Sequence, residues 1–407
     1  IRYRARIEAW KAPVQPASIL QMVRCMTPRE RVLTALEHSV PDRVPIDFGG
    51  GQTGIHRLAY QKLIRHLGLV ERVETADLVQ QLAQPSEAVL ERLHVDTRYV
   101  WAACPGGLMS QVNQDCVSVG GQLEFTDEFG VTWSICATAP HYCYIKASPL
   151  AGLSLEQIKQ YPFPKGDDPS RFEDVRDRAI SLKHAGRYAI ISGDAASLFE
   201  MCCRLRGLGN VLTDMILQPE VIEVLIERVL EFWLGWFRLF LAEVGDVVDI
   251  ITIADDLGAQ EGPLVAPEIY RKIIKPRQQR LVQFIKSRTR AKIWYHSCGA
   301  ITQFIPDLIE TGVDILNPLQ SSAKDMDLAR LKAEYGRHLV FWGGGVDAPE
   351  LTQCRTPVQV REAVRRNMEA LKPGGGFVFA PAHNIQPDTP PEFILAMFDA
   401  AAEHGKY

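Results

Sequence analysis

The sequence lacks the long apolar run that a membrane span requires. Its most apolar stretch, residues 229–244, is interrupted by Glu231, Arg238 and Glu243 and falls short of the ~20 apolar residues that cross a bilayer. Residues 1–21 are basic at the start and contain no continuous apolar segment, so no secretory signal is predicted. We therefore expect the apolar stretch to form a core helix.

A net basic charge is also absent. The 407 residues carry a formal net charge of −4, which gives no overall positive field to hold nucleic acid or an anionic membrane. The composition, 46% hydrophobic and 23% charged, is ordinary for a soluble globular enzyme. These numbers favour a small-molecule substrate or a protein partner and predict neither a nucleic-acid nor a membrane partner.

The chain has no regular cysteine framework. Its nine cysteines are an odd number without repeated spacing, which favours a reducing, cytoplasmic compartment over disulfide pairing. Cys136 and Cys143 are alternative metal ligands, but they lack a C-x-x-C spacing, and buried thiols are the favoured interpretation. The glycine runs 343–345 and 374–376 match no phosphate-binding loop, so tight turns are expected there.

Short apolar strands alternating with helical patterns are what the sequence does contain. Eight strands are predicted, at 43–48, 97–101, 188–192, 248–253, 292–295, 313–316, 338–341 and 376–379. Helices are predicted at 27–38, 56–67, 73–93, 171–186, 195–217, 219–244, 267–288, 301–311, 325–335, 357–371 and 391–403. Eight such units predict an α/β fold of the (β/α)8 TIM-barrel type. A doubly wound open sheet fits the alternation too, but no G-x-G-x-x-G follows the first strand.

One segment breaks the alternation after the second strand. Residues of about 104–150 hold scattered cysteines, and 122–135 alternates around a turn as a β-hairpin does. We expect an N-terminal extension over 1–25, followed by a single barrel domain over 26–407 that carries this insertion on one face.

Polar residues gather just after the predicted strands. In a barrel the carboxyl ends of all strands open on one rim, where reactive groups collect. The residues at these positions are Asp47, Asp194, Asp255, Asp256, His296, Cys298, Asn317, Asp347 and His383.

His296 and Cys298 are the strongest candidate ligands in this set. They follow the strand in the segment AKIWYHSCG, and residues two apart on an extended chain face the same way. An imidazole and a thiolate suit Zn²⁺ and disfavour magnesium or calcium. The alternative is a core cysteine beside a hydrogen-bonded histidine. The barrel would bring His383 to the same rim as a third ligand, leaving the open position of a catalytic zinc site.

The last 160 residues also resemble a known family. The segments WYHSCG at 294–299, GVDILN at 312–317, GGGVD at 343–347 and GGGFVFAPAHNIQ at 374–386 resemble the uroporphyrinogen decarboxylase superfamily. Within it, the likeness is closer to the zinc-dependent corrinoid methyltransferase (O-demethylase) branch. The resemblance spans about residues 26–403 and implies a TIM barrel.

The sequence departs from both branches of that superfamily. True uroporphyrinogen decarboxylases carry an Arg-rich segment near the first strand, where this chain has the acidic, glycine-rich IDFGGGQ at 46–52. The methyltransferases use H-x-C plus a later cysteine, whose place His383 takes here. A neutral imidazole in place of a thiolate raises the net charge of a zinc site from zero to +1, which strengthens the Lewis acid.

These features predict a zinc-dependent methyltransferase. It would move a methyl group from a small methylated donor, an O-methyl ether above all, to the cobalt of a corrinoid (cobalamin) carried by a separate corrinoid protein. The alternative is a cofactor-free decarboxylase of the same family, which should need clustered arginines at the rim. A third interpretation is a non-catalytic zinc-binding or methyl-carrying accessory protein.

Other rim residues receive supporting roles. Asp255 and Asp256 are candidate catalytic acids, and one of them is an alternative fourth zinc ligand; helix capping is the competing interpretation. Asp347 is either a hydrogen-bond partner of a ligating histidine or a cap. Predicted substrate-binding residues, which would orient polar groups of the substrate, are Asp47, Gln260, Asn317, Gln320 and Asn384.

Overall fold

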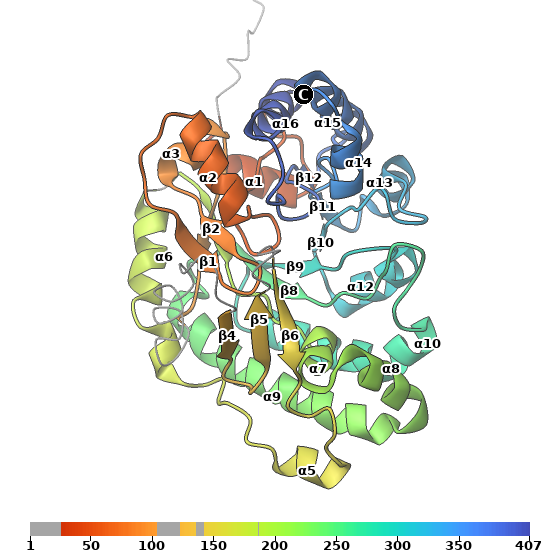
Figure 1. Ribbon diagram of the computed structural model, residues 1–407. Helices are drawn as coiled ribbons and strands as arrows, with labels where there is room; N and C mark the ends of the chain where they lie inside the picture. Colours follow the sequence, from red (N-terminus) through yellow and green to blue (C-terminus); the bar gives the residue numbers. More distant parts are fainter. Residues whose placement is uncertain (1–25, 104–122, 136–141, 186) are drawn as a thin grey trace, which may run out of the picture.

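A parallel sheet of seven strands forms the centre of the computed structural model, which describes residues 26–103, 123–135, 142–185 and 187–407 (Figure 1). The strands follow the order β12-β11-β10-β9-β8-β7-β3, so each neighbours the next along the chain. Their bounds are β3 Thr97–Val100, β7 Ala189–Ser192, β8 Ile250–Ala254, β9 Lys292–His296, β10 Ile315–Asn317, β11 Val340–Trp342 and β12 Phe377–Val378. Most residues of these strands are buried on both faces, as apolar parallel strands covered by helices should be.

The segment 44–47 fills the eighth position and closes the sheet into a barrel. On one side, the Asp47 amide donates to the Phe379 carbonyl at 2.8 Å, just after β12. On the other side, the Asp96 amide donates to the Ile46 carbonyl at 2.7 Å, just before β3. The predicted (β/α)8 barrel is therefore confirmed. The segment predicted as a strand at 43–48 joins it in the predicted place through an isolated bridge, Ile46 with Phe379, and not as a regular strand.

Helix α1 (Pro28–Leu36) closes the N-terminal end of the barrel. Thr27 and Glu30 form a capping box, which satisfies amides that the first turn would otherwise leave unpaired. Val32, fully buried, joins an apolar cluster of inward-facing strand residues that includes Trp294. The barrel centre is thus a packed core, and ligands must bind at its other end.

The remaining helices surround the strands (Figure 1). They are α2 Arg57–His66, α3 Glu87–Arg92, α5 Leu155–Gln160, α6 Val175–His184, α7 Phe199–Arg206, α8 Leu208–Leu217, α9 Pro219–Val244, α10 Pro267–Ile269, α11 Lys275–Lys286, α12 Ile305–Thr311, α13 Leu328–Tyr335, α14 Ala348–Gln353, α15 Pro357–Leu371 and α16 Pro391–His404. The predicted core helix is α9, in which Trp236 stacks on Phe240 at a centroid distance of 4.5 Å. This aromatic face packs in the main hydrophobic core, as its helical spacing predicts.

The insertion contains a three-stranded antiparallel sheet. The predicted hairpin is confirmed as β4 (Leu123–Thr126) and β5 (Thr132–Ile135), with β6 (Cys143–Ala147) pairing to β5 as a third strand. Asp127 shapes the hairpin turn by accepting hydrogen bonds from the amides of Phe129 and Val131. The expected extension 1–25 and Cys136 lie outside the described residues.

The predicted helix over 73–93 is wrong. The structure has the hairpin β1 (Glu74–Asp77) and β2 (Leu82–Gln84), followed by α3. The Asp77 carboxylate accepts from the Gln80 amide at 2.8 Å and so closes a turn that interrupts any helix. Pro85 then precedes Ser86, whose hydroxyl caps α3. Local turn chemistry outweighed the helical spacing of the apolar residues.

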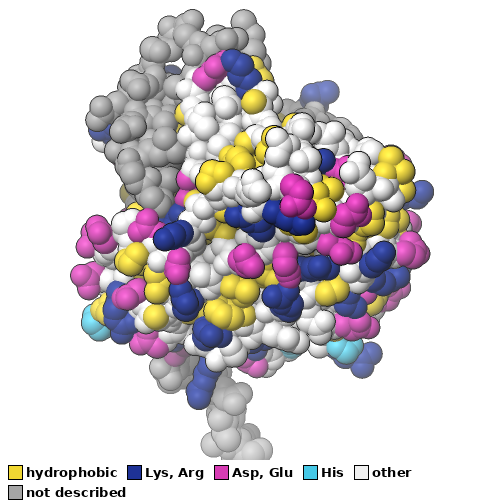
Figure 2. Space-filling model, turned by 90° about the horizontal axis from the view of Figure 1, so that it is seen from below, with side chains coloured by type: hydrophobic (Ala, Val, Ile, Leu, Met, Phe, Trp, Pro, Cys, Tyr) yellow, Lys and Arg dark blue, Asp and Glu magenta, His cyan; other side chains and the backbone are white. Residues whose placement is uncertain are grey.

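No helix in the described part of the chain has both the length and the apolar character to span a bilayer. Acidic and basic side chains are interspersed on the face shown in Figure 2, with no large area of one sign. That distribution agrees with the modest net charge of the sequence.

Candidate active site and metal-ligand group

Three predicted ligands converge at the carboxyl end of the barrel. Ligand atoms of His296, Cys298 and His383 all lie within 4.8 Å of one another. His296 ends β9, and His383 follows β12, three strands away in the sheet. Barrel closure therefore brings together side chains that are separated by 87 positions in the sequence, as predicted.

His296 is fixed on both sides of its ring. It is 8% exposed, its Nδ1 lies 2.5 Å from Oδ1 of Asn317, and its Nε2 lies 3.4 Å from Sγ of Cys298. Asn317 pairs with His296 in the register of β9 and β10. The ring therefore presents Nε2 toward the group of ligands.

The turn after β9 requires glycine. Gly299 has φ +83°, and a Cβ there would lie 2.6 Å from the carbonyl carbon of Gly258. A side chain would both strain the backbone and overlap the neighbouring loop. The Asp256 carboxylate accepts from the Cys298 amide at 2.9 Å and helps to hold the sulfur over the barrel.

In the absence of a cation, the electrostatics of the group favour a neutral His383 imidazole and a protonated Cys298 thiol. Burial, with a smaller contribution from the nearby His296, lowers the pKa of His383 to about 4. Burial, together with Asp256, raises the pKa of the Cys298 thiol well above its usual range. A cation would reverse the effect on Cys298, because a coordinated thiol loses its proton.

A cavity of about 640 Å³ opens above the ligands. Its polar side contains His296, His383 and Asp256. Its opposite side comes from the insertion sheet, β1–β2, the glycine-rich loop and helices α7 and α8. The residues contributed by these elements are Gly51, Gln52, Val79, Gln80, Trp133, Tyr142, Cys143, Ile145, Ser148, Glu200, Cys203, Arg204, Gly207 and Leu208.

The cavity has one arginine among the described residues that line it, and that arginine is paired. Arg204 forms an ion pair with Glu200 one helical turn earlier in α7 and lies 5.7 Å from the Trp133 ring centre. Gln52 contributes a buried side-chain oxygen that has no hydrogen-bond partner within the described chain. The wall thus combines aromatic and apolar side chains with polar groups that are available to orient a ligand.

The two candidate acids have different environments. Asp256 lines the cavity and its side chain is 44% exposed, with Oδ1 3.9 Å from Nε2 of His296. Asp255 is 1% exposed and accepts hydrogen bonds from the amides of Leu198 and Glu200, at the start of α7. Burial raises the pKa of Asp255 to about 7. Only Asp256 faces the cavity, and Asp255 holds α7 in place.

Among the described residues that line the cavity, none of the five predicted substrate-binding residues appears. Asp47 is fully buried and accepts hydrogen bonds from Tyr99 and the indole of Trp342. Asn384 bonds the glycine-rich loop, accepting from Gly54 at 2.7 Å and donating to Gly51 at 2.9 Å.

Two predicted substrate-binding glutamines, Gln260 and Gln320, and the predicted partner or cap Asp347 hold neighbouring loops. Gln320 donates to Oε1 of Gln260 at 2.9 Å and accepts from the Gly299 amide at 2.9 Å. Asp347 is the N-cap of α14, accepting from the Glu350 amide at 3.0 Å, which agrees with its capping interpretation. None of these three residues lines the cavity, and Gln320 supports the turn that follows Cys298.

Reasoning from the sequence did not identify the residues that form the cavity wall. Trp133 lies in the predicted hairpin, and Glu200 and Arg204 lie at i,i+4 on a predicted helix. The available signal was the position of an insertion over the rim, since an element placed there must form part of any pocket.

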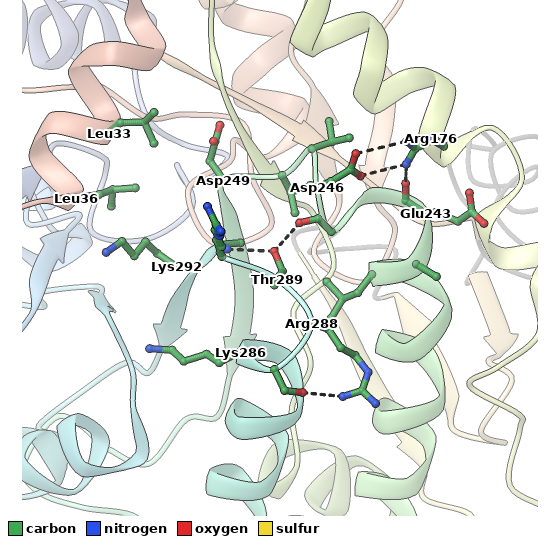
Figure 3. Close-up of a pocket in the computed structure, with 18 of the residues that line it drawn as sticks. Leu33, Leu36, Arg176, Glu243, Asp246, Asp249, Lys286, Arg288, Thr289 and Lys292 are labelled. Atoms are coloured by element: carbon green, nitrogen blue, oxygen red, sulfur yellow. Dashed lines mark hydrogen bonds and ion pairs between the residues drawn. The ribbon is translucent and has the colours of Figure 1, made fainter.

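A larger cavity, of about 1020 Å³, lies at the opposite end of the barrel beside α1 (Figure 3). Its charged side chains are mostly paired: Arg29 with Asp249 at 2.6 Å, and Lys292 with Glu37 at 2.9 Å. Among the described residues that line it there is no group of metal ligands, and it lies at the end of the barrel where catalytic residues are not expected. The smaller cavity is therefore the candidate active site.

Comparison with known proteins assigns the family. A family model described as uroporphyrinogen decarboxylase (URO-D) matches residues 145–404, more than half of the chain. The chain belongs to the uroporphyrinogen decarboxylase family. The resemblance seen in the sequence is thereby confirmed at the family level. No curated protein matched the chain.

Solved structures support the fold of this family member. A methyltransferase from Methanosarcina mazei superposes with a TM-score of 0.60 at 19% identity, covering 93% of this chain and 99% of that one. A β-glycosidase from Thermosphaera aggregans gives a TM-score of 0.41 at 10% identity, covering 90% and 97%. The first likeness establishes a shared fold, and the second carries no further argument.

Proposed function

We propose that this protein is a zinc-dependent methyltransferase that moves a methyl group from a small O-methyl ether to the cobalt of a separate corrinoid protein. The observation that carries the proposal is the convergence of two imidazoles, both lining the cavity, with the thiol of Cys298. The fold shared with a methyltransferase from Methanosarcina mazei supports the choice of reaction class.

The donor atoms fit Zn²⁺ in type and spacing. Tetrahedral zinc with ordinary Zn–N and Zn–S bond lengths places N and S about 3.5 Å apart. The His296 Nε2 to Cys298 Sγ distance is 3.4 Å, before any ion draws the ligands together. Burial keeps His383 neutral at physiological pH, which is the form that binds a metal.

Zinc bound by two imidazoles and a thiolate would supply a Lewis acid of net charge +1 toward the ether oxygen. The overall change is balanced: the CH₃–O bond breaks, a CH₃–Co bond forms with Co(I) supplying the electron pair, and a proton converts the leaving alkoxide to an alcohol. Asp256 is the candidate donor of that proton, because its carboxyl group lines the cavity.

The cavity wall favours a methyl ether over a tetrapyrrole acid. A decarboxylase of this family would need several cations for its substrate carboxylates, whereas the described wall holds Arg204 already paired with Glu200. Trp133 and Tyr142 offer aromatic surface to an apolar donor. The buried oxygen of Gln52 can accept a hydrogen bond from a polar group of that donor.

The test combines metal analysis with a methyl-transfer assay. The purified protein should contain about one zinc per chain and should convert Co(I) cobalamin to methylcobalamin, seen in the cobalt spectrum, with at least one ether in a donor panel. His296→Ala, Cys298→Ala and His383→Ala should lose zinc and activity together. His338→Ala and Cys354→Ala, outside the cavity, are matched controls that should keep both. Absence of zinc together with absence of methylation would refute the proposal.

A further inference from the structure

Asn317 is buried against the ligand group and has both ends of its amide engaged. Its side chain is 0% exposed, Nδ2 donates to the Trp342 carbonyl at 3.0 Å, and Oδ1 lies 2.5 Å from Nδ1 of His296. It pairs with His296 across β9 and β10, so backbone hydrogen bonds fix the separation of the two side chains. The sequence pattern suggested that Asn317 orients substrate, but each end of its amide already has a partner and the residue does not line the cavity.

The backbone of Trp342 determines which way the amide faces. A peptide carbonyl can only accept a hydrogen bond, so the atom of Asn317 that faces it must be the NH₂ group. The atom facing His296 is then the amide oxygen, which also can only accept. Nδ1 of His296 must therefore carry a hydrogen, and in the neutral ring Nε2 holds the lone pair.

Nε2 is the nitrogen on the side of the other ligands, 3.4 Å from Sγ of Cys298. We propose that Asn317 is a positioning residue that holds His296 in the Nδ1-protonated tautomer, so that the lone pair of Nε2 faces the metal position. The proposal deepens the proposed function and rests on its metal site. It replaces the predicted substrate-binding role of Asn317 with one that acts through His296.

An amide in this place has a consequence that a carboxylate would not share. Zinc-binding histidines commonly donate their other N–H to a carboxylate or carbonyl, and a carboxylate makes the ligand more basic. Asn317 is neutral and so orients the ring without adding negative charge. That choice agrees with a ligand set whose net charge with Zn²⁺ is +1.

The tautomer can be read without any metal. In the zinc-free protein labelled with ¹⁵N-histidine, at about pH 8 where imidazoles are neutral, long-range ¹H–¹⁵N correlations distinguish a protonated from an unprotonated ring nitrogen. His296→Gln identifies the signals of His296 among the ten histidines. We expect Nδ1 protonated and Nε2 unprotonated. A wild-type spectrum showing Nε2 protonated would overturn the proposal, whether or not the protein uses zinc.

Two substitutions extend the test to metal binding. Asn317→Leu removes the acceptor and should weaken Zn²⁺ or Co²⁺ binding about 10- to 100-fold. Asn317→Asp keeps an acceptor for Nδ1 of His296 but loses the donor to the Trp342 carbonyl. A folded Asn317→Asp variant should keep the tautomer, while methyl transfer from an ether slows through kcat. Asn367→Leu is the matched control, since Asn367 is another buried asparagine whose side chain donates to a backbone carbonyl, that of Gly345.

The outcomes separate this inference from the proposed function. If the wild-type protein binds no Co²⁺ but shows the expected tautomer, the zinc enzyme fails and the positioning of His296 by Asn317 stands. If folded Asn317→Leu binds Co²⁺ as tightly as wild type and changes only KM for the donor, Asn317 binds substrate and the inference fails.

Discussion

His383 determines the charge of the proposed zinc site. With two imidazoles and one thiolate, a bound Zn²⁺ retains a net charge of +1, and a second thiolate would neutralise it. We expect His383→Cys to keep zinc, because Cys ligates zinc as well as His does, but to lower kcat/KM for an ether donor about ten-fold or more. Metal content and methylcobalamin formation measure the two effects.

His338→Cys is the control for this substitution, because His338 is exposed and outside the cavity. It should change neither zinc content nor rate. If His383→Cys demethylates ethers as fast as the wild type, the charge of the site does not set the rate.

The buried carboxyl group of Asp255 should make the free energy of unfolding depend on pH. Burial raises its pKa from an ordinary 3.8 to about 7 in the folded chain. The folded state therefore holds the proton more tightly than the unfolded state, and this contribution to stability is lost as the pH rises from about 4 to about 7. Between about pH 5 and pH 8, we expect the advantage of the wild type over Asp255→Asn to shrink by about 2 kcal/mol. Urea unfolding at several pH values measures this change. A constant difference in the free energy of unfolding between the wild type and Asp255→Asn across this pH range would contradict the prediction.

At the scale of elements, the glycine-rich loop after the first strand is held by close packing. A Cβ on Gly50 would lie 2.3 Å from Cζ of Tyr99, whose hydroxyl donates to the Asp47 carboxylate at 2.9 Å. Gly50→Ala must displace that ring or the loop, and we expect a loss of about 1–3 kcal/mol in the free energy of unfolding. Gly152→Ala is the control, since nothing lies within 4 Å of a Cβ there. Equal stabilities of the two variants in urea would show that the loop can shift freely.

Elements with strong burial patterns were predictable, and those decided by tertiary contacts were not. The strand ending at His296 and the helix α9 have sequences that only a buried strand and a buried helix accommodate. The segment 73–93 has apolar residues at helical spacing, yet it forms a hairpin whose β2 pairs with the rim of the barrel at His56. The turn at Asp77 is a local signal that the helical spacing obscured, whereas the pairing partner His56 lies outside any local window of sequence.

At the scale of the whole molecule, topology explains which part of the site the sequence could predict. A closed parallel barrel places every strand end on one rim, so a histidine after β12 meets a histidine at the end of β9. Knowing that all strand ends lie on one rim does not tell which of the rim side chains point into the cavity. Asn384 and His383 are adjacent in sequence, but only His383 lines the cavity.

The proposed function requires a corrinoid protein to reach the open side of the cavity. The cavity opens beside exposed apolar side chains of the insertion and of α8: Ile145 is 38% and Leu208 is 46% exposed, and both line the cavity. A protein that delivers cobalt to the ligands must cover these residues, whereas free cobalamin has less surface to place against them. We expect Leu208→Glu to raise KM for the corrinoid protein about ten-fold, because a charge would be buried in the contact.

Methyl transfer to free Co(I) cobalamin should be unchanged in Leu208→Glu, which separates docking from chemistry. Val358→Glu is the control, since Val358 is 72% exposed on α15 and does not line the cavity. An equal loss of methyl-transfer activity with the corrinoid protein and with free cobalamin would mean that Leu208 shapes the cavity for the donor. No loss with either acceptor would place the docking surface elsewhere on the rim.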